Sequence, residues 1–175
     1  MKYLKEPFSQ GDLDSLCGLY SLVNIAHYLI GPFNEEEGQD MICHMLDLLD
    51  EREGAVTVFN EGIEIKTMSY LIRNVLRKEY GIKYQKLFKK GKYRGRGGRI
   101  NEMAKKINIE ENIALISLDG RYTHWSAVYR VSRRRLFCYD SNQMQWINLI
   151  DTSLTRKGRK IHKIVKNECY LFYLK

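Results

Sequence analysis

The chain has 175 residues, of which 44% are apolar, and a formal net charge of +8. This length supports one well-buried core and is short for two, so we predict a single domain over residues 1–175. No stretch approaches the roughly 18 consecutive apolar residues of a membrane span, and the N-terminus lacks the apolar segment of a cleaved signal peptide. We therefore expect a soluble protein with no membrane partner, which acts in the cytoplasm or is delivered into a target cell as an effector.

Charge is unevenly divided along the chain. Residues 1–85 contain 8 Lys/Arg and 14 Asp/Glu, whereas residues 86–175 contain 21 and 7, so an acidic half precedes a basic one. Such blocks influence partners rather than fold. The densest basic run, residues 86–99, fits a solvated loop, a face that docks an acidic protein, or a nucleic-acid contact through phosphates and stacking. Its seven cations are Lys86, Lys89, Lys90, Lys92, Arg94, Arg96 and Arg99.

The predicted elements change from helices to strands along the chain. Apolar residues recur at helical spacing over residues 17–30, 35–51 and 67–81, and Gly81 is a suitable helix-ending residue. A short helix follows near residues 100–107. Strand-like runs then occupy residues 113–118, 123–131, 135–140, 144–150 and 168–174. This order predicts an α+β fold, in which we expect Trp125 to face the core and Trp146 to pack against the sheet.

Cys17 follows a polar turn and begins the first predicted helix. Unpaired N–H groups and the positive end of the helix dipole favour the nucleophilic thiolate there, with Asp14 or Ser15 as a possible cap. Gly18 leaves space beside the sulfur for a substrate. The alternative is that Cys17 is a small buried core residue. No C-x-x-C pair indicates a zinc site or a disulfide framework, so we interpret all four cysteines as free thiols: Cys17, Cys43, Cys138 and Cys169.

A thiolate nucleophile needs a base, and His124 is the best candidate. His27 and His44 lie inside predicted helices, and His162 lies in a basic run. His124 instead opens a strand whose hairpin partner ends at Asp140. If the turn is centred on Ser132, His124 and Asp140 lie directly opposite on one face of the sheet, close enough for the carboxylate to orient the imidazole. A shift of one residue would place them on opposite faces. Asn142 is then the alternative orienting residue.

A cysteine at a helix start, followed by a distant histidine on a strand and an aspartate after a hairpin, resembles the papain-like cysteine peptidase and amidase superfamily. The helix start "CGLYSLVN" and the sixteen-residue step from His124 to Asp140 are most similar to its compact bacterial branch, which includes the peptidase domains that cleave bacteriocin leaders. The resemblance implies a helical lobe, bearing the nucleophile on its N-terminal helix, packed on an antiparallel sheet lobe. It also implies that Cys17 attacks a carbonyl, that His124 transfers the proton and that Asp140 orients His124.

In the same family a glutamine donates a hydrogen bond to the oxyanion, and Gln10 matches it here. Gln10 lies seven positions before Cys17, one more than in papain, so the connecting loop must bulge. The sequence also departs from papain around the nucleophile, because "SLCGLY" has leucines in place of the second cysteine and the aromatic residue.

The expected chemistry is acyl transfer through a thioester, without a cofactor or metal. The same residues would serve limited proteolysis, glutamine deamidation or transamidation. We expect a protein substrate with an acidic surface, because the half of the chain that carries His124 and Asp140 is basic. The alternative is a catalytically inactive basic module that binds nucleic acid or an acidic protein.

Overall fold

A computed structural model describes residues 5–11, 14–88, 95–109, 112–120, 123–154 and 160–174. Its helices are α1 (Cys17–Ile30), α2 (Glu35–Glu53), α3 (Ala55–Glu61), α4 (Ile65–Leu71), the π-helical η1 (Ile72–Arg77), α5 (Gly95–Ile107), η2 (Leu149–Asp151) and η3 (Lys166–Glu168). Its strands are β1 (Lys83–Lys86), β2 (Ile113–Gly120), β3 (His124–Val131), β4 (Arg135–Tyr139), β5 (Trp146–Asn148), β6 (Thr152–Ser153), β7 (His162–Ile164) and β8 (Tyr170–Tyr173). The α+β order predicted from the sequence is confirmed.

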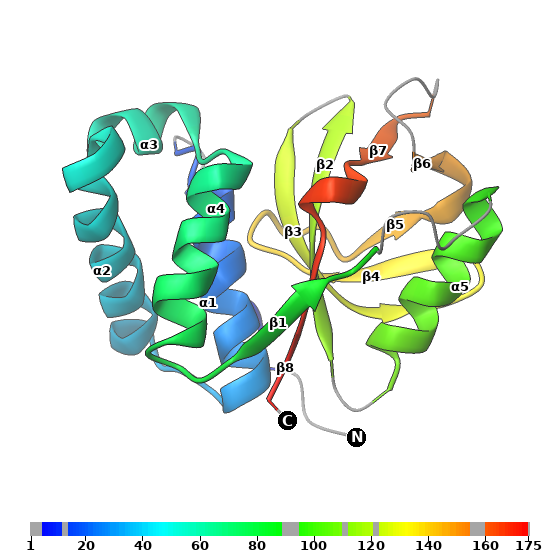
Figure 1. The fold of residues 1–175 in the computed structure, drawn as a ribbon, viewed down its shortest axis with the longest axis horizontal. Helices are drawn as coiled ribbons and strands as arrows, with labels where there is room; N and C mark the ends of the chain where they lie inside the picture. Colours follow the sequence, from blue (N-terminus) through cyan, green and yellow to red (C-terminus); the bar gives the residue numbers. More distant parts are fainter. Residues whose placement is uncertain are drawn as a thin grey trace.

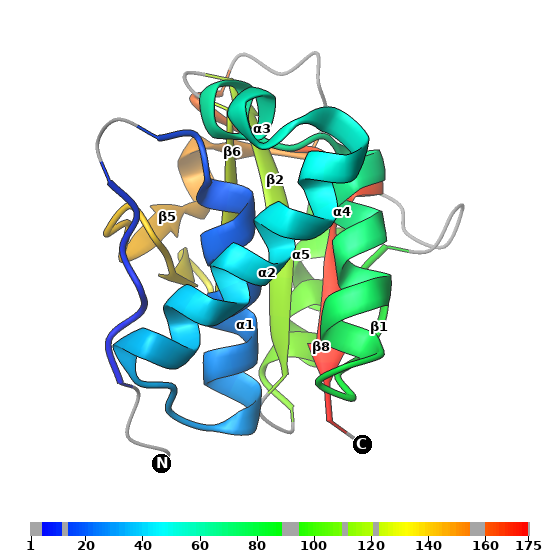
Figure 2. The ribbon, with the colours of Figure 1, turned by 90° about the vertical axis from the view of Figure 1, so that its left-hand side faces the viewer.

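The described strands form one sheet whose main path runs β1-β8-β2-β3-β4-β5, with β7 also paired to β2. All pairs are antiparallel except β6 with β7. Helices α1 to α4 gather on one side of the sheet, and α5 lies at its opposite side (Figure 1). Seen from the helical side, α1 runs between α2 and the sheet (Figure 2). None of the helices in the described part of the chain has the length and apolar character that a membrane crossing requires.

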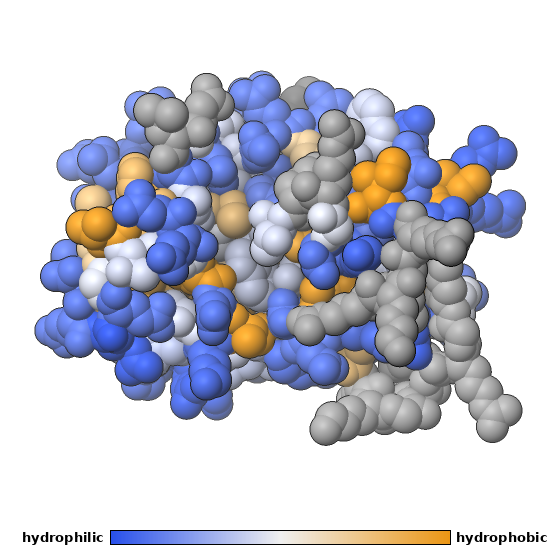
Figure 3. Space-filling model, turned by 90° about the horizontal axis from the view of Figure 1, so that it is seen from above, coloured by the Kyte–Doolittle hydropathy of each residue, from blue (hydrophilic) through white to orange (hydrophobic). Residues whose placement is uncertain are grey.

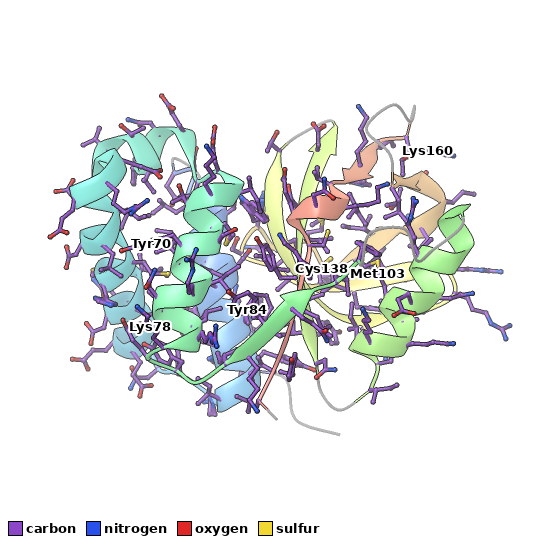
Figure 4. The ribbon with its side chains drawn as sticks, viewed as in Figure 1. Tyr70, Lys78, Tyr84, Met103, Cys138 and Lys160 are labelled. Carbon is purple, nitrogen blue, oxygen red and sulfur yellow. The ribbon has the colours of Figure 1, made fainter. Side chains whose placement is uncertain are left out.

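Two hydrophobic cores lie on the two faces of the sheet. The larger core surrounds α1, which buries nearly its whole length because apolar residues occupy most of its turns. Trp125 belongs to this core, as predicted. The second core lies under α5 and contains Met103 and Cys138 (Figure 4). Both cores share β2 and β3, so burial of apolar surface on each side holds the helical lobe against the sheet.

Several elements differ from the sequence prediction. The helix predicted over residues 67–81 is α4 followed by η1, which ends at Arg77; a turn then leads to Gly81, whose φ of 67° is left-handed as the prediction required. The expectation that Trp146 packs against the sheet is wrong, since 42% of its surface is exposed. Its strand β5 ends the main path of the sheet, next to β4.

Four of the seven cations of the basic run at residues 86–99 lie outside the described residues. These are Lys89, Lys90, Lys92 and Arg94, and the side chain of Arg96 is not described either. Lys86 is described, and its ammonium lies 3.7 Å from the centre of the Tyr170 ring and donates a 2.7 Å hydrogen bond to the Asn167 carbonyl. This lysine is therefore used within the fold.

Candidate active site

Cys17 is the first residue of α1, and its environment is that of an uncapped helix start. The cap position is Leu16, and no side chain in the described part of the chain accepts from the first-turn N–H groups. The prediction that Asp14 or Ser15 caps the helix is therefore wrong. The Asp14 carboxylate accepts from the Leu16 N–H at 3.0 Å, and the Ser15 hydroxyl donates to the Asn60 carbonyl at 2.9 Å. Cys17 is half-buried, so its sulfur lies beside backbone donors that a ligand oxygen can use.

Gly18 serves packing rather than substrate access. It is buried, and a Cβ atom there would lie 2.6 Å from Ile63 Cγ1 and 3.2 Å from Met68 Cε. The absence of a side chain lets the first turn of α1 approach the connection between α3 and α4. The expectation of open space at Gly18 is therefore corrected, and this close approach fixes the backbone that carries Cys17.

Gly18→Ala should destabilise the protein by about 1–3 kcal/mol, because the added methyl overlaps the Ile63 side chain. The midpoint of urea unfolding measures this change. Gly97→Ala is a matched control, since nothing lies within 4 Å of a Cβ at Gly97 in α5. The control should be neutral or stabilising by up to about 1 kcal/mol. Equal effects of the two substitutions would contradict the packing role of Gly18.

His124 is the first residue of β3, and the helical lobe holds this end of the strand in place. The Ser21 hydroxyl of α1 donates to the Trp125 carbonyl at 2.9 Å, and the Trp125 indole donates to the Ile63 carbonyl at 3.1 Å. Both α1 and β3 begin at the upper end of the molecule as drawn in Figure 1, and Figure 3 views that end from above. Residues from both lobes therefore meet there.

The imidazole of His124 connects the thiol to Asp140. Its Nε2 lies 2.8 Å from Asp140 Oδ2, and it also hydrogen-bonds the Cys17 side chain. Because Asp140 occupies Nε2, Nδ1 is the ring nitrogen left for the sulfur. His124 is 6% exposed and Asp140 is 2% exposed, so the pair is screened from water. The structure thus brings the predicted Cys17, His124 and Asp140 together in one chain of contacts.

The environment of His124 favours the charged imidazolium. Burial is the largest single influence and lowers its pKa. The hydrogen bonds to Asp140 and Cys17 and the negative charges of those groups outweigh burial, and they raise the pKa of His124 to about 9. At neutral pH the ring is therefore protonated.

Asp140 is fixed by the backbone of the turn that follows it. Its Oδ1 accepts from the Asn142 N–H at 2.9 Å and from the Met144 N–H at 3.4 Å, which leaves Oδ2 for His124. Gln143 adopts a left-handed conformation with φ 57° within this turn. The orienting group is therefore Asp140, while Asn142 contributes its backbone N–H to holding that carboxylate.

The hairpin between β3 and β4 reaches this geometry through a bulge. Near the turn, Val131 pairs with Leu136 and Arg130 with Phe137, a register that would leave His124 and Asp140 on opposite faces if it continued. A register shift between Val128 and Arg130 adds one residue to β3.

Beyond the bulge, Ala127 pairs with Tyr139, so Asp140 follows on the same face as Ser126 and His124. The prediction of directly opposite positions is therefore wrong, because the two side chains meet diagonally, two residues apart along the ladder. Diagonal neighbours on one face remain within reach of long side chains.

Gln10 lies against the residue that follows Asp140. Its backbone N–H donates to the Ser141 carbonyl at 3.0 Å, and its side-chain oxygen accepts from the Ser141 hydroxyl at 3.0 Å. The side-chain carbonyl is thus occupied, and the amide nitrogen is the end left to donate. The predicted bulge between Gln10 and Cys17 includes residues 12–13, which lie outside the described residues.

Ser141 was not singled out by the sequence analysis, although it belongs to the turn sequence "DSNQ". It joins the Asp140 turn to the segment that precedes α1. The sequence therefore indicated that Ser141 lies in a turn, but it did not indicate which residue the serine contacts.

The other cysteines and histidines have different environments. Cys138 and Cys169 are buried, and burial is the main cause of the raised pKa of each thiol, to about 12 for Cys169. Cys43 is exposed on α2. His44 pairs with Glu79 at 3.0 Å on the surface, and His27 accepts from the Phe33 N–H at 2.9 Å. Cys17 is thus the cysteine that has His124 as a neighbour.

No protein-family model matches this chain, and no curated protein matches it either. The chemistry of the site is therefore inferred from its geometry.

Proposed function

We propose that this chain is a papain-like cysteine hydrolase that acts on an amide bond of a protein substrate. The observation that carries the proposal is the hydrogen-bonded series from the Cys17 side chain through His124 to Asp140, located at a helix start without a side-chain cap. A nucleophile, a base within hydrogen-bonding reach and a group that orients the base are the components of thiol-based acyl transfer.

The first step is attack on the amide carbonyl. The charged His124 ring stabilises the Cys17 thiolate, whose sulfur forms a bond to the carbonyl carbon. The resulting oxyanion accepts a hydrogen bond from the Cys17 backbone N–H. The Gln10 amide, which Ser141 positions, supplies a second donor. One preorganised donor of this kind contributes about 3 kcal/mol to transition-state stabilisation.

The second half of the reaction releases the enzyme. His124 gives its proton to the leaving amine as the carbon–nitrogen bond breaks, which leaves a thioester on Cys17. The neutral ring then removes a proton from water, and the hydroxide oxygen displaces the sulfur to give a carboxylate. Asp140 keeps the imidazole in one orientation throughout, with Nε2 toward the carboxylate and Nδ1 toward the reacting atoms.

The substrate would approach beside α3. The loop before Cys17 is bound to this helix, because the Ser15 N–H donates to the Phe59 carbonyl at 2.9 Å. On α3, Val56 is 75% exposed and Phe59 is 44% exposed. These apolar side chains offer a contact surface for a protein substrate next to the thiol.

A comparison of intact masses tests the reaction and separates its two forms. Lysate is incubated with the wild type or with Cys17→Ala, and Cys43→Ala serves as the matched control because it removes an exposed thiol away from His124. We expect the wild type and Cys43→Ala to convert one protein into two fragments, or one amide into an acid. Fragments identify a peptidase, and an unbroken chain with a new acid identifies a deamidase. Identical lysates from the wild type and Cys17→Ala would contradict hydrolysis and favour a binding module.

A further inference from the structure

A groove is lined by residues of β4 and of the segments on either side of it, and Cys17 is not among its lining residues. It has a volume of about 680 Å³, within the range of ligand-binding clefts, and is formed between residues 5–9 and residues 143–146. Neither Cys17 nor His124 is in its wall. Asp140 is, so the groove begins at the residue that orients the candidate base.

The wall of this groove is rich in aromatic rings. It includes Tyr129, Phe137, Tyr139 and Trp146. Trp146, which lies in the end strand β5, is 42% exposed. An open wall of this kind offers apolar and stacking contacts, which is the composition of an interface centre rather than of ordinary surface.

Cations surround these rings. The Arg130 guanidinium lies 4.0 Å from the centre of the Phe137 ring, and the Arg135 guanidinium lies 4.6 Å from the centre of the Trp146 ring. Neither has a carboxylate partner among the residues that the structure describes. Stacking on a ring fixes the plane of a guanidinium and leaves its N–H edge free for a carboxylate.

The charge balance around the groove is positive. Lys5 and Glu6 line one side, whereas Arg130 and Arg135 flank the other. Asp140 adds little free negative charge, because its oxygens accept from His124 and from two backbone N–H groups. A ligand with carboxylates and apolar side chains complements this arrangement.

A peptide fits these observations better than a nucleic acid does. The first turn of α2 carries Glu35, Glu36 and Glu37, and the half of the chain that builds the helical lobe has a net negative charge. A long polyanion that crossed both lobes would be repelled there. A short acidic segment of a protein needs to contact only the groove, while the neighbouring segment reaches Cys17.

We propose that this groove binds an acidic segment of the protein substrate that also carries aromatic or aliphatic side chains. The carboxylates contact Arg130 and Arg135, and the apolar side chains contact Phe137 and Trp146. The proposal rests on the proposed function only for the role of the segment as substrate. Binding itself does not require the thiol.

Fluorescence anisotropy with a labelled copolymer of glutamate and tyrosine tests the groove in the Cys17→Ala background. The matched probes are a copolymer of lysine and tyrosine and an oligothymidylate of similar length. We expect the acidic copolymer to bind and the basic one not to. The double variant Arg130→Glu, Arg135→Glu should weaken binding about tenfold or more, and Trp146→Ala about fivefold.

The control variants separate the groove from general charge. Lys66→Glu with Lys83→Glu makes the same change in net charge at exposed positions outside the groove, and should alter binding by less than about twofold. An equal loss in both double variants, tighter binding of the oligothymidylate, or no binding of the acidic copolymer would overturn the proposal. The same groove substitutions made in the chain that retains Cys17 report separately on the thiol chemistry, and labelling of Cys17 by iodoacetamide should match that of the unmodified chain.

Discussion

Brief treatment with iodoacetamide at pH 6 is expected to label Cys17 first among the cysteines. An ordinary thiol has a pKa of about 8.5, so less than about 1% of it is thiolate at this pH. His124, with a pKa raised to about 9, is charged at pH 6 and hydrogen-bonds the Cys17 side chain. Since the imidazolium favours the thiolate, Cys17 should react about a hundredfold faster than the exposed Cys43. Mass mapping of labelled peptides measures the two rates.

His124→Ala should remove most of this advantage and slow the labelling of Cys17 by about a hundredfold, because the thiol then loses its cationic partner. His44→Ala is the matched control, since His44 is an exposed histidine whose partner is Glu79. It should leave the rate at Cys17 unchanged. Faster labelling of Cys43, or an equal effect of the two histidine substitutions, would contradict the assignment of Cys17 as nucleophile.

The positions of Cys17 and His124 were accessible to sequence analysis because each depends on a local pattern. Helical spacing of apolar residues after Cys17 marks it as the first residue of α1, and a strand-like run marks His124 as the start of β3. What the local pattern did not supply was the reason for Gly18. That glycine contacts Ile63 and Met68, which are distant in sequence, and a contact of this kind leaves no periodic signal.

The pairing of His124 with Asp140 was predicted correctly, but for a geometry that the chain does not adopt. Two residues sixteen positions apart on a hairpin lie on the same face of the sheet in one register and on opposite faces when the register shifts by one residue. The bulge between Val128 and Arg130 makes this one-residue shift and so places both side chains on the same face. Neither glycine nor proline occurs there, so nothing in the composition of β3 marks the bulge.

Contacts between distant segments also explain why Ser141 and the groove were missed. The contact that matters at Ser141 is its hydrogen bond to Gln10, which is distant in sequence. The wall of the groove likewise combines residues 5–9 with β4 and the turn after it. The exposure of Trp146 has the same origin. A strand pattern predicts alternation of faces, but it does not tell whether another element covers the outer face of an edge strand.

Asp140→Asn is expected to lower the pKa of His124 by more than about one unit, the largest change of any substitution that leaves both reacting groups in place. Asparagine keeps the shape of the side chain and removes the charge that offsets burial, and burial lowers the pKa of this ring. In the wild type the pKa of about 9 lies above the unfolded value of about 6.5. The stability that protonated His124 contributes is therefore complete below about pH 6.5, and it is lost as pH rises through 9.

NMR titration of the His124 ring measures the pKa directly, and urea unfolding between pH 6 and 9.5 measures the linked stability in a Cys17→Ser background, where the thiol does not titrate. The parent in that background should lose about 1–3 kcal/mol over this interval, and Asp140→Asn should lose much less.

In the chain that retains Cys17, Asp140→Asn should shift the pH dependence of turnover in the same direction, because the imidazolium must protonate the leaving amine. The alkaline limb of the turnover profile, near pH 9, should move to lower pH. Asn142→Ala is the control, since only the backbone N–H of Asn142 contacts Asp140. If Asn142→Ala moved the titration of His124 further than Asp140→Asn did, the orienting role would belong to Asn142.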